Sequence, residues 1–246
     1  MPKQLKFKII VPAYNVEQWA EKNINSILSQ KYENFQIYYT DDISTDKTFE
    51  IVQKLNNGKI DLVRNTEKKF ALQNIVESIE RSQPDDEDVI VLVDGDDWLV
   101  HDNVLNVLKD KYEQEDLVLT YGSFITSNTG HRPGMLSMYT DNVIDNNLFR
   151  KDSWRASHLR TFKYKLWKNI KNEDLRTPDG KYFRMAWDLA IMFPMLEMAG
   201  KRFSLIQEPL YVYNMENPIS DHKVSRKLQH LTDVYIRSKK PYQRIF

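Results

Sequence analysis

Three carboxylates lie within four positions near the middle of the chain. They belong to Asp94, Asp96 and Asp97, which follow an apolar segment at residues 89–93, and Gly95 separates the first two. A run of five apolar, mostly β-branched residues indicates a strand that is buried on both faces. Hard divalent cations prefer oxygen ligands, and a buried strand fixes where such oxygens lie. We therefore predict a site for a divalent cation and a diphosphate at the end of this strand.

Polar side chains also follow the three strands expected earlier in the chain. These strands are predicted at residues 7–11, 35–39 and 60–63, and the segments between them carry apolar residues at helical spacing. Such alternation predicts βαβ units and a mostly parallel sheet, in which ligands bind outside the carboxyl ends of the strands. The polar residues expected at that edge are Tyr14, Asn15, Asp41, Asp42, Arg64 and Asn65.

The second half of the chain is less regular. A strand is expected at residues 117–121, and the polar stretch 122–147 suits a loop or lid that faces a substrate. The later elements expected are two helical pieces within 153–170, a helix at 182–199 kinked by Pro194, strands at 203–206 and 210–213, and an amphipathic helix at 223–240. No repeat, low-complexity tract or linker marks a domain boundary.

Composition narrows the classes of function. The 35 Lys and Arg residues balance the 35 Asp and Glu residues, so no nucleic-acid partner is expected. The absence of cysteine excludes disulfides, thiolate catalysis and cysteine-ligated zinc. No apolar run reaches the roughly 18 residues of a membrane span, and the first residues lack the pattern of a signal peptide. We therefore expect a cytoplasmic protein.

Three segments together resemble the signature motifs of family 2 glycosyltransferases of the GT-A fold. They are Ile-Val-Pro-Ala-Tyr-Asn at 10–15, Asp-Asp-Ile-Ser-Thr-Asp at 41–46 and Val-Asp-Gly-Asp-Asp-Trp at 93–98. The resemblance implies one α/β domain over residues 1–246, with a mixed, mostly parallel sheet flanked by helices. Residues 1–125 are then expected to bind the nucleotide sugar, and residues 126–246 the acceptor.

The resemblance implies a role for the acidic turn. Asp94, Gly95 and Asp96 correspond to the Asp-X-Asp motif of the family, which holds Mg²⁺ or Mn²⁺ against the diphosphate of the donor. A bound metal neutralises the charge that develops as this group leaves. His222, shortly before the last helix, is a candidate third ligand of the metal. A solvated acidic turn and a surface histidine are the alternatives.

A second set of residues is implied to bind the nucleoside. Either Asp41 or Asp42 would accept a hydrogen bond from the base, which favours uracil, although GDP and dTDP sugars also occur in the family. The residues implied to complete this site are Pro12, Ala13, Tyr14, Asn15 and Arg64. Ile43 departs from the glycine that is usual at its position.

The resemblance also points to a catalytic base. An inverting transfer needs a carboxylate that takes the proton of the acceptor hydroxyl. Asp188 matches the second residue of the Glu-Asp pair that serves the family, and Trp187 replaces the glutamate. An acid that merely favours the start of a helix is the alternative interpretation of Asp188.

These assignments predict metal-dependent, inverting transfer of a sugar from a nucleotide-diphospho-sugar, UDP-linked by preference. The acceptor would be a hydroxyl of a glycan, a lipid-linked sugar or a protein. A sugar-nucleotide nucleotidyltransferase, a Mg²⁺-dependent phosphoacceptor or phosphatase, and an inactive nucleotide-sugar-binding module are the alternatives. For the helix at 223–240 we expect packing on its own domain, with peripheral contact to an anionic membrane or a homodimer as alternatives.

Overall fold

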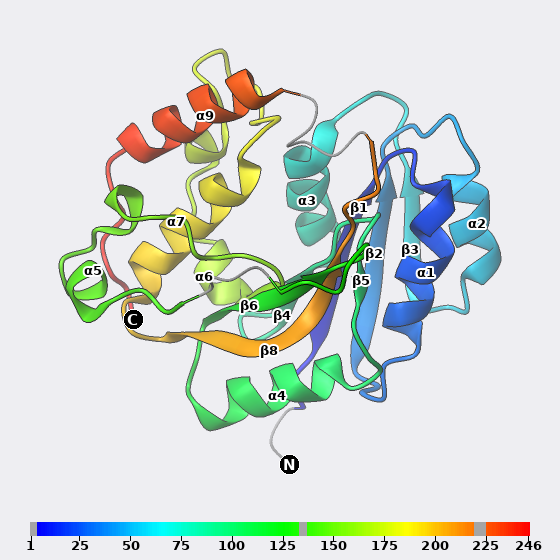
Figure 1. Ribbon diagram of the computed structural model, residues 1–246, viewed down its shortest axis with the longest axis horizontal. Helices are drawn as coiled ribbons and strands as arrows, with labels where there is room; N and C mark the ends of the chain where they lie inside the picture. Colours follow the sequence, from blue (N-terminus) through cyan, green and yellow to red (C-terminus); the bar gives the residue numbers. More distant parts are fainter. Residues whose placement is uncertain (1–3, 133–136, 219–224) are drawn as a thin grey trace.

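The structure, a computed structural model, describes residues 4–132, 137–218 and 225–246. One sheet of eight strands runs through it in the order β3-β2-β1-β4-β7-β6-β8-β5, with helices on both faces (Figure 1). The predicted α/β architecture with a mixed sheet is therefore confirmed. Within the described residues, no helix is both long enough and apolar enough to cross a bilayer.

The first half of the chain forms successive βαβ units, as predicted. Its elements are β1 (Phe7–Ala13), α1 (Glu17–Leu28), β2 (Phe35–Asp41), α2 (Thr48–Leu55), β3 (Ile60–Arg64), α3 (Phe70–Arg81) and β4 (Val89–Leu92). Strand β1 pairs in parallel with β2 and β4, and β2 pairs in parallel with β3. The carboxyl ends of these strands therefore meet at one edge of the sheet.

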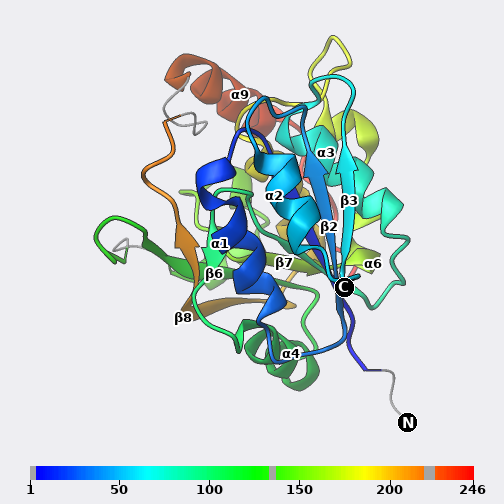
Figure 2. The ribbon, with the colours of Figure 1, turned by 90° about the vertical axis from the view of Figure 1, so that its right-hand side faces the viewer.

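The alternation of side chains along β1 separates two cores. Ile9 and Val11 pack in a cluster with residues of α1 and α4, whereas Ile10 packs in a cluster with residues of α3 and α7. Figure 2 shows α1 and α2 side by side on one face of the sheet and α3 on the other. Both faces are thus covered, which explains why β1 is buried along its whole length.

The second half extends the same sheet. Its elements are β5 (Trp98–Leu99), α4 (Val104–Gln114), β6 (Leu119–Thr126), α5 (Asp141–Asp145), β7 (Arg160–Lys163), α6 (Tyr164–Trp167), α7 (Trp187–Ala199), β8 (Phe203–Tyr213) and α9 (Arg226–Ser238), with single 3₁₀ turns at Phe149–Lys151 and Asn172–Leu175. Strand β7 lies antiparallel between β4 and β6, while β8 pairs in parallel with β6 and antiparallel with β5.

Three expectations for this half are wrong. Residues 153–170 contain β7 and the one-turn α6 instead of two helical pieces, because Thr161 and Phe162 are fully buried between β4 and β6. Pairing to distant strands outweighs the local preference there. The two strands expected between 203 and 213 form the single strand β8, whose register shifts against β6 near Ser123. The expected loop at 122–147 begins later than predicted because β6 continues to Thr126.

Helix α9 also differs from its prediction. Its apolar residues Leu228, Leu231, Val234 and Tyr235 are exposed, and among its residues only Ile236 is buried. The helix packs on its own domain, as expected, but through Ile236 and its polar side, with Arg237 bonded to the backbone of Arg150 and Asp152, and not through this apolar face. We call these four exposed residues the outer stripe of α9.

Candidate active site

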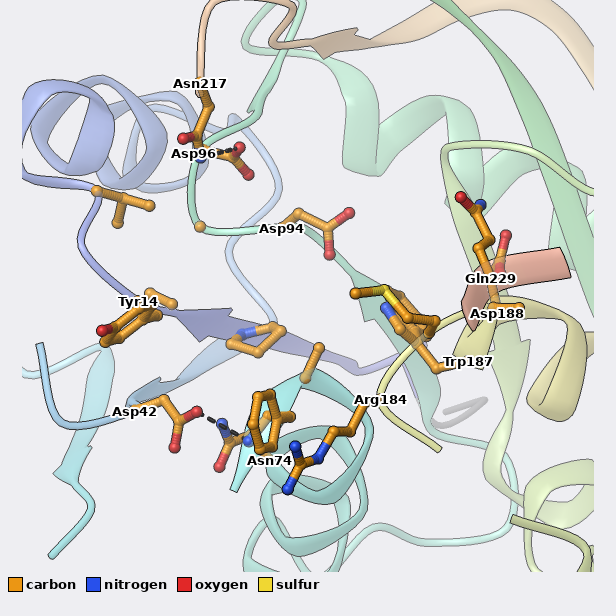
Figure 3. A pocket seen from close by; sticks show the side chains of 18 of the residues that line it. Tyr14, Asp42, Asn74, Asp94, Asp96, Arg184, Trp187, Asp188, Asn217 and Gln229 are labelled. Carbon is orange, nitrogen blue, oxygen red and sulfur yellow. Dashed lines mark hydrogen bonds between the residues drawn. The ribbon is translucent and has the colours of Figure 1, made fainter. Parts of the chain in front are cut away.

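A cavity of about 670 Å³ opens at the carboxyl edge of the sheet, within the range of roughly 300–1,000 Å³ typical of ligand sites. Figure 3 shows side chains from several separate elements around it. The predicted residues on its wall are Pro12, Ala13, Tyr14, Asp42, Asp94, Gly95, Asp96 and Asp188. The fold thus gathers residues that lie up to 176 positions apart in the sequence.

The acidic turn after β4 is shaped by a glycine and fastened by an asparagine. A Cβ atom at Gly95 would lie 2.6 Å from the Cβ atom of Ala13, so a larger residue does not fit at this position. The fully buried Asn23 of α1 donates hydrogen bonds to the carbonyl oxygens of Asp94 at 3.0 Å and Asp97 at 2.7 Å. These contacts hold the backbone of the turn, and therefore its carboxylates, against β1 and α1.

The three carboxylates of the turn have different surroundings. The side chain of Asp94 is 25% exposed and borders the cavity. Asp96 accepts a hydrogen bond from Nδ2 of Asn217 at 2.7 Å. Asp97 is buried and accepts one from the backbone N–H of Asn214 at 2.7 Å. Burial, and then the charges of Asp96 and Asp94, raise the pKa of Asp97 well above its usual range.

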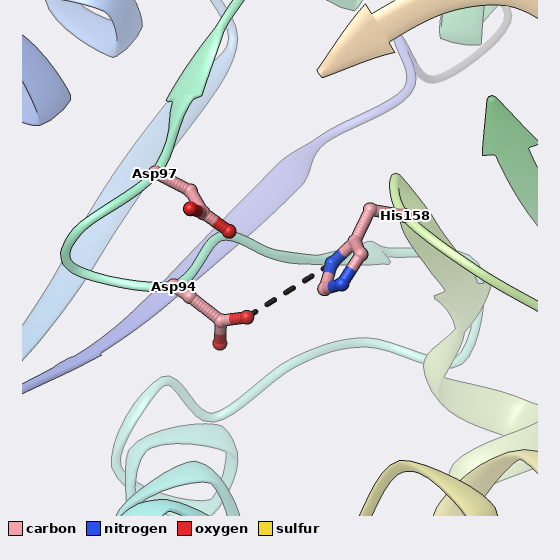
Figure 4. A group of neighbouring side chains, drawn as sticks. All are labelled: Asp94, Asp97 and His158. Carbon is pink, nitrogen blue, oxygen red and sulfur yellow. Dashed lines mark ion pairs between the residues drawn. The ribbon is translucent and has the colours of Figure 1, made fainter. Parts of the chain in front are cut away.

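A histidine from a distant segment joins this turn. The ligand atoms of Asp94, Asp97 and His158 all lie within 4.8 Å of one another (Figure 4). The His158 ring stacks on Tyr211, with centroids 4.8 Å apart. Burial, and then the charge of Arg160, lower the pKa of His158 well below its usual value, so its imidazole is neutral. Two carboxylates and a neutral imidazole are a donor set that fits a divalent metal.

Neither Asp97 nor His158 was among the metal ligands predicted from the sequence. Asp97 adjoins the motif, but nothing in the sequence distinguishes it from a solvated neighbour. His158 precedes β7, and it is the pairing of β7 with β4 that brings it to the turn. The third predicted ligand, His222, lies outside the described residues, and its role stays a prediction.

The candidate base Asp188 lies in the first turn of α7, on the wall of the cavity. Its Oδ2 accepts a hydrogen bond from Nη2 of Arg160 at 3.1 Å. The buried Arg160 also places Nη1 3.3 Å from Nδ1 of His158. Its guanidinium lies 5.6 Å from the ring centroid of Trp187, the residue that replaces the family's glutamate. The partner of Asp188 is therefore an arginine from β7.

Of the predicted pair after β2, Asp42 is the residue that lines the cavity. Its carboxylate accepts hydrogen bonds from the backbone N–H groups of Lys69 at 2.9 Å and Phe70 at 2.8 Å, and from Nδ2 of Asn65 at 2.8 Å. Burial alone would raise the pKa of Asp42, but these hydrogen bonds and the charge of Lys68 lower it below its ordinary value.

Asp41 is not among the residues that line the cavity. Its Oδ2 accepts a hydrogen bond from the backbone N–H of Ser44 at 3.1 Å and lies 3.3 Å from Nε of Arg64. Asn15 is likewise engaged with its neighbours, since its Oδ1 accepts a hydrogen bond from the backbone N–H of Thr45 at 2.8 Å. These contacts join Asp41, Arg64 and Asn15 to neighbouring loops. The predicted contact of these three residues with a nucleotide stays a prediction.

Several residues around the cavity have left-handed backbone conformations. Ile43, at the position where glycine is usual, has φ of 59° and so retains the conformation that favours glycine. Asn15, Phe70 and Ala186 have φ of 50°, 64° and 50°. Each left-handed residue other than glycine lowers the stability of the fold by about 1–3 kcal/mol, and the surrounding packing must offset this loss.

Two further cations and a further wall border the cavity. Nζ of Lys68 lies over the ring of Tyr14 and 3.3 Å from the carboxylate of Asp42. Arg184, from the segment before α7, lies over the ring of Phe70 at 4.2 Å. The wall is formed by three residues at the start of α9, namely Ser225, Leu228 and Gln229.

Comparison with known proteins identifies the family. The family model described as Glycosyl transferase family 2 matches residues 8–185. The Escherichia coli protein WfaP, a UDP-Glc:alpha-D-GlcNAc-diphosphoundecaprenol beta-1,3-glucosyltransferase, is 30% identical over 118 residues, which cover 47% of this chain and 45% of that protein. The chain spans 26%, 46% and 45% of the length of three curated relatives.

Solved structures show the same fold. Residues 1–349 of Staphylococcus aureus TarS, in complex with UDP-GlcNAc, match with a TM-score of 0.69 at 18% identity, over 90% of this chain and 61% of that one. The mannosyltransferase PcManGT from Pyrobaculum calidifontis, in complex with GDP-Man and Mn²⁺, matches with a TM-score of 0.61 at 18% identity, over 98% of this chain and 67% of that one.

Proposed function

The chain belongs to glycosyltransferase family 2 and has the GT-A fold, and we propose that it transfers a sugar, with inversion, from a UDP-linked donor to a hydroxyl group. The observation that carries the proposal is that the acidic turn and Asp188 line one cavity. A leaving-group site and a base are the two parts that such a transfer requires.

The acidic turn would hold the metal and the diphosphate. A bound Mn²⁺ or Mg²⁺ would neutralise the charge that develops on the departing diphosphate. Asp94 and Asp96 would bind the ion, and Asp97 and His158 are further donors within reach of Asp94. The Mn²⁺ in the PcManGT complex and the mixed oxygen and nitrogen donors at this turn support a divalent ion. Asn23 and Gly95 keep the turn in place, so the ligands are positioned before the donor arrives.

Asp188 would act as the base. Its carboxylate takes the proton of the acceptor hydroxyl as the acceptor oxygen forms a bond to the anomeric carbon and the bond to the diphosphate oxygen breaks. Arg160 holds this carboxylate in one orientation. A second cavity of about 350 Å³ lies between α7 and α9 and shares Ala186, Asp188 and Gln229 with the first. Asp188 thus borders space on two sides, which supports an acceptor that enters between α7 and α9.

Three observations support the choice of donor and acceptor. TarS was solved with UDP-GlcNAc, and Asp42 offers a carboxylate on the cavity wall beside Tyr14, which suits the imide N–H of uracil. WfaP is named for a lipid-linked sugar acceptor. A hydroxyl on a lipid-linked sugar is therefore the acceptor that we favour over a free glycan or a protein.

Calorimetry with UDP tests the proposal. We expect binding in the presence of Mn²⁺ and none after chelation, and hydrolysis of a UDP-sugar by the wild-type protein.

Two variants distinguish between the two possible sets of metal ligands. If Asp94 and Asp96 hold the ion, Asp96→Asn weakens metal-dependent UDP binding by about tenfold or more, whereas His158→Phe, which keeps a ring on Tyr211, leaves it unchanged. The reverse result assigns the ion to Asp94, Asp97 and His158. A wild-type protein that binds no nucleotide diphosphate under any metal condition would contradict the proposal.

A further inference from the structure

Helix α9 presents its apolar side to solvent. The exposed fractions of Leu228, Leu231, Val234 and Tyr235, the outer stripe, are 43%, 56%, 53% and 37%. These residues follow one another at intervals of three and four, so they form one continuous strip along the helix. A helix that packs on its own domain has the opposite orientation, because its apolar face is the one removed from water.

The polar side of α9 faces the protein. Gln229 borders both cavities, and Asp233 and Arg237 line the smaller one. Nη1 of Arg237 donates to the carbonyl oxygens of Arg150 at 2.9 Å and Asp152 at 2.8 Å. The orientation of the helix is therefore set by specific hydrogen bonds on its polar side. The outer stripe stays largely exposed, although Leu228 borders the large cavity and the ring of Tyr235 lies 6.0 Å from that of Phe183.

The charge around α9 is strongly one-sided. Residues 225–246 contain six Lys and Arg side chains and one Asp, a formal charge of +5, whereas the whole chain has +0. Lys227 and Lys240 are exposed and form no ion pair with a described residue, and the exposed Arg226 borders the smaller cavity. An apolar strip flanked by basic residues on a helix of 13 residues is the pattern of a helix that lies in the surface of an anionic bilayer.

We propose that α9 docks on an anionic lipid surface through its outer stripe and the basic residues beside it. A two-fold contact between two copies would place two segments of charge +5 opposite each other, which disfavours a second copy as the partner. A nucleic acid would satisfy the charges but leave the four apolar side chains without an apolar partner. A bilayer surface supplies acyl chains for the stripe and anionic headgroups for the cations.

The position of α9 adds a consequence for the substrate. The start of the helix is a wall of the large cavity, and its polar side lines the smaller cavity beside Asp188. Figure 1 shows α9 at the rim of the molecule, beyond α7 and away from the sheet. Docking would bring the entrance between α7 and α9 to the headgroup level, where the sugar of a lipid-linked acceptor lies. This consequence rests on the proposed function, whereas the docking itself does not.

Flotation with lipid vesicles tests the proposal. We expect the full chain to float with vesicles of phosphatidylcholine and phosphatidylglycerol, and several-fold less with phosphatidylcholine alone or in high salt. Leu231→Gln/Val234→Gln changes two exposed residues that do not line the large cavity, and should abolish flotation while UDP binding stays unchanged. Lys227→Glu/Lys240→Glu should abolish it as well. The matched control Lys47→Glu/Lys54→Glu changes the net charge equally at exposed sites at α2, away from α9, and should float like the wild type.

Three results would overturn the docking proposal. They are no flotation of the wild-type chain with anionic vesicles, normal flotation of Leu231→Gln/Val234→Gln, and a dimer in light scattering that this double variant dissociates. UDP binding, measured on the same samples, separates the two proposals. Flotation without any nucleotide binding would support docking and contradict the proposed transferase activity.

Discussion

Nη2 of Arg160 lies 3.1 Å from Oδ2 of Asp188, although 28 positions separate the two residues. Arg160 begins β7 and is paired with Leu92, the last residue of β4, two positions before Asp94. The register between these antiparallel strands therefore sets the distance between the candidate base and the acidic turn. We regard Arg160 as a positioning residue, because its contact is with the base.

Substitution of the base should separate chemistry from binding. Asp188→Asn removes the proton acceptor but keeps the shape of the side chain, so we expect transfer to fall by about 10²–10⁴-fold while the affinity for UDP is retained. Steady-state kinetics and calorimetry measure the two quantities. Transfer at the wild-type rate by Asp188→Asn would place the base elsewhere.

Arg160→Lys tests positioning. The lysine keeps the charge but cannot reproduce the planar fork, so we expect kcat to fall by about tenfold with little change in the KM for the donor. Arg155→Lys is the matched control, because Arg155 makes an ion pair with Asp152 at 3.0 Å and does not line the large cavity. Equal losses in the two variants would show that the effect at Arg160 is not specific to the site.

A methyl group at Gly95 should disturb the acidic turn. Gly95→Ala forces its Cβ against that of Ala13, and overpacking of this kind costs about 1–3 kcal/mol in the free energy of unfolding. UDP affinity should fall as well, since the turn must shift. Ala13→Gly/Gly95→Ala removes the Cβ–Cβ contact and should recover part of both losses, which urea unfolding and calorimetry measure. Additive losses in the double variant would contradict this steric explanation.

The hydrogen bonds of Asp42 should make stability depend on pH. The pKa of Asp42 in the folded protein lies below its ordinary value of 3.8. Its contribution to stability is therefore fully present above that value and is lost as the pH falls through the folded pKa. We expect Asp42→Asn to lower the free energy of unfolding by about 1–3 kcal/mol at neutral pH, and the difference from the wild type to shrink below about pH 4.

Urea unfolding at several pH values measures this difference. The control is Asp145→Asn, because Asp145 pairs with Lys201 at the surface, with side chains 48% and 63% exposed. Its effect should stay within about 0.5 kcal/mol. If Asp42→Asn lowered the free energy of unfolding equally at neutral and acidic pH, the charge of the carboxylate would not contribute to stability.

The effects of substituting Arg150 and Glu197 on the free energy of unfolding should be strongly coupled. Nε of Arg150 lies 2.6 Å from the Glu197 carboxylate, and the two side chains are 5% and 0% exposed. Arg150→Met leaves a buried unpaired carboxylate and should cost about 3–5 kcal/mol, whereas Arg150→Met/Glu197→Leu should recover most of this loss. Urea unfolding of the single and double variants tests the coupling. A double variant as unstable as Arg150→Met would contradict it.

The residues that the sequence predicted well are those whose neighbours are local. Apolar periodicity located the βαβ units of the first half. Parallel strands have their carboxyl ends at the same edge of a sheet, whatever the order of the strands. The assignment of Asp42, Asp94 and Asp96 to a common site therefore follows from the sequence pattern alone, and all three line the large cavity. The placement of Asp188 on the same cavity depended on the family resemblance, because no local pattern connects residues 94 and 188.

The features that escaped prediction depend on distant contacts. His158 reaches the acidic turn only because β7 inserts between β4 and β6, and β7 lies in a segment whose aromatic and basic residues suggested a helix. Helix α9 has the periodicity that was expected, but periodicity does not say which side meets the protein. That orientation depends on partners of Arg237 such as the backbone of Arg150, 87 positions away.

The acidic turn is held at both ends by strands that are far apart in the sheet order. It leaves β4 near the centre and enters β5, whose pairing partner is β8. Its backbone N–H at Asp94 donates to the hydroxyl of Tyr211 at 3.0 Å, and Asp97 accepts from the backbone of Asn214. During synthesis, a chain that has emerged only as far as β6 carries every aspartate of the turn but none of these later anchors. The donor site would therefore become complete late in translation, after all the residues that give it its charge.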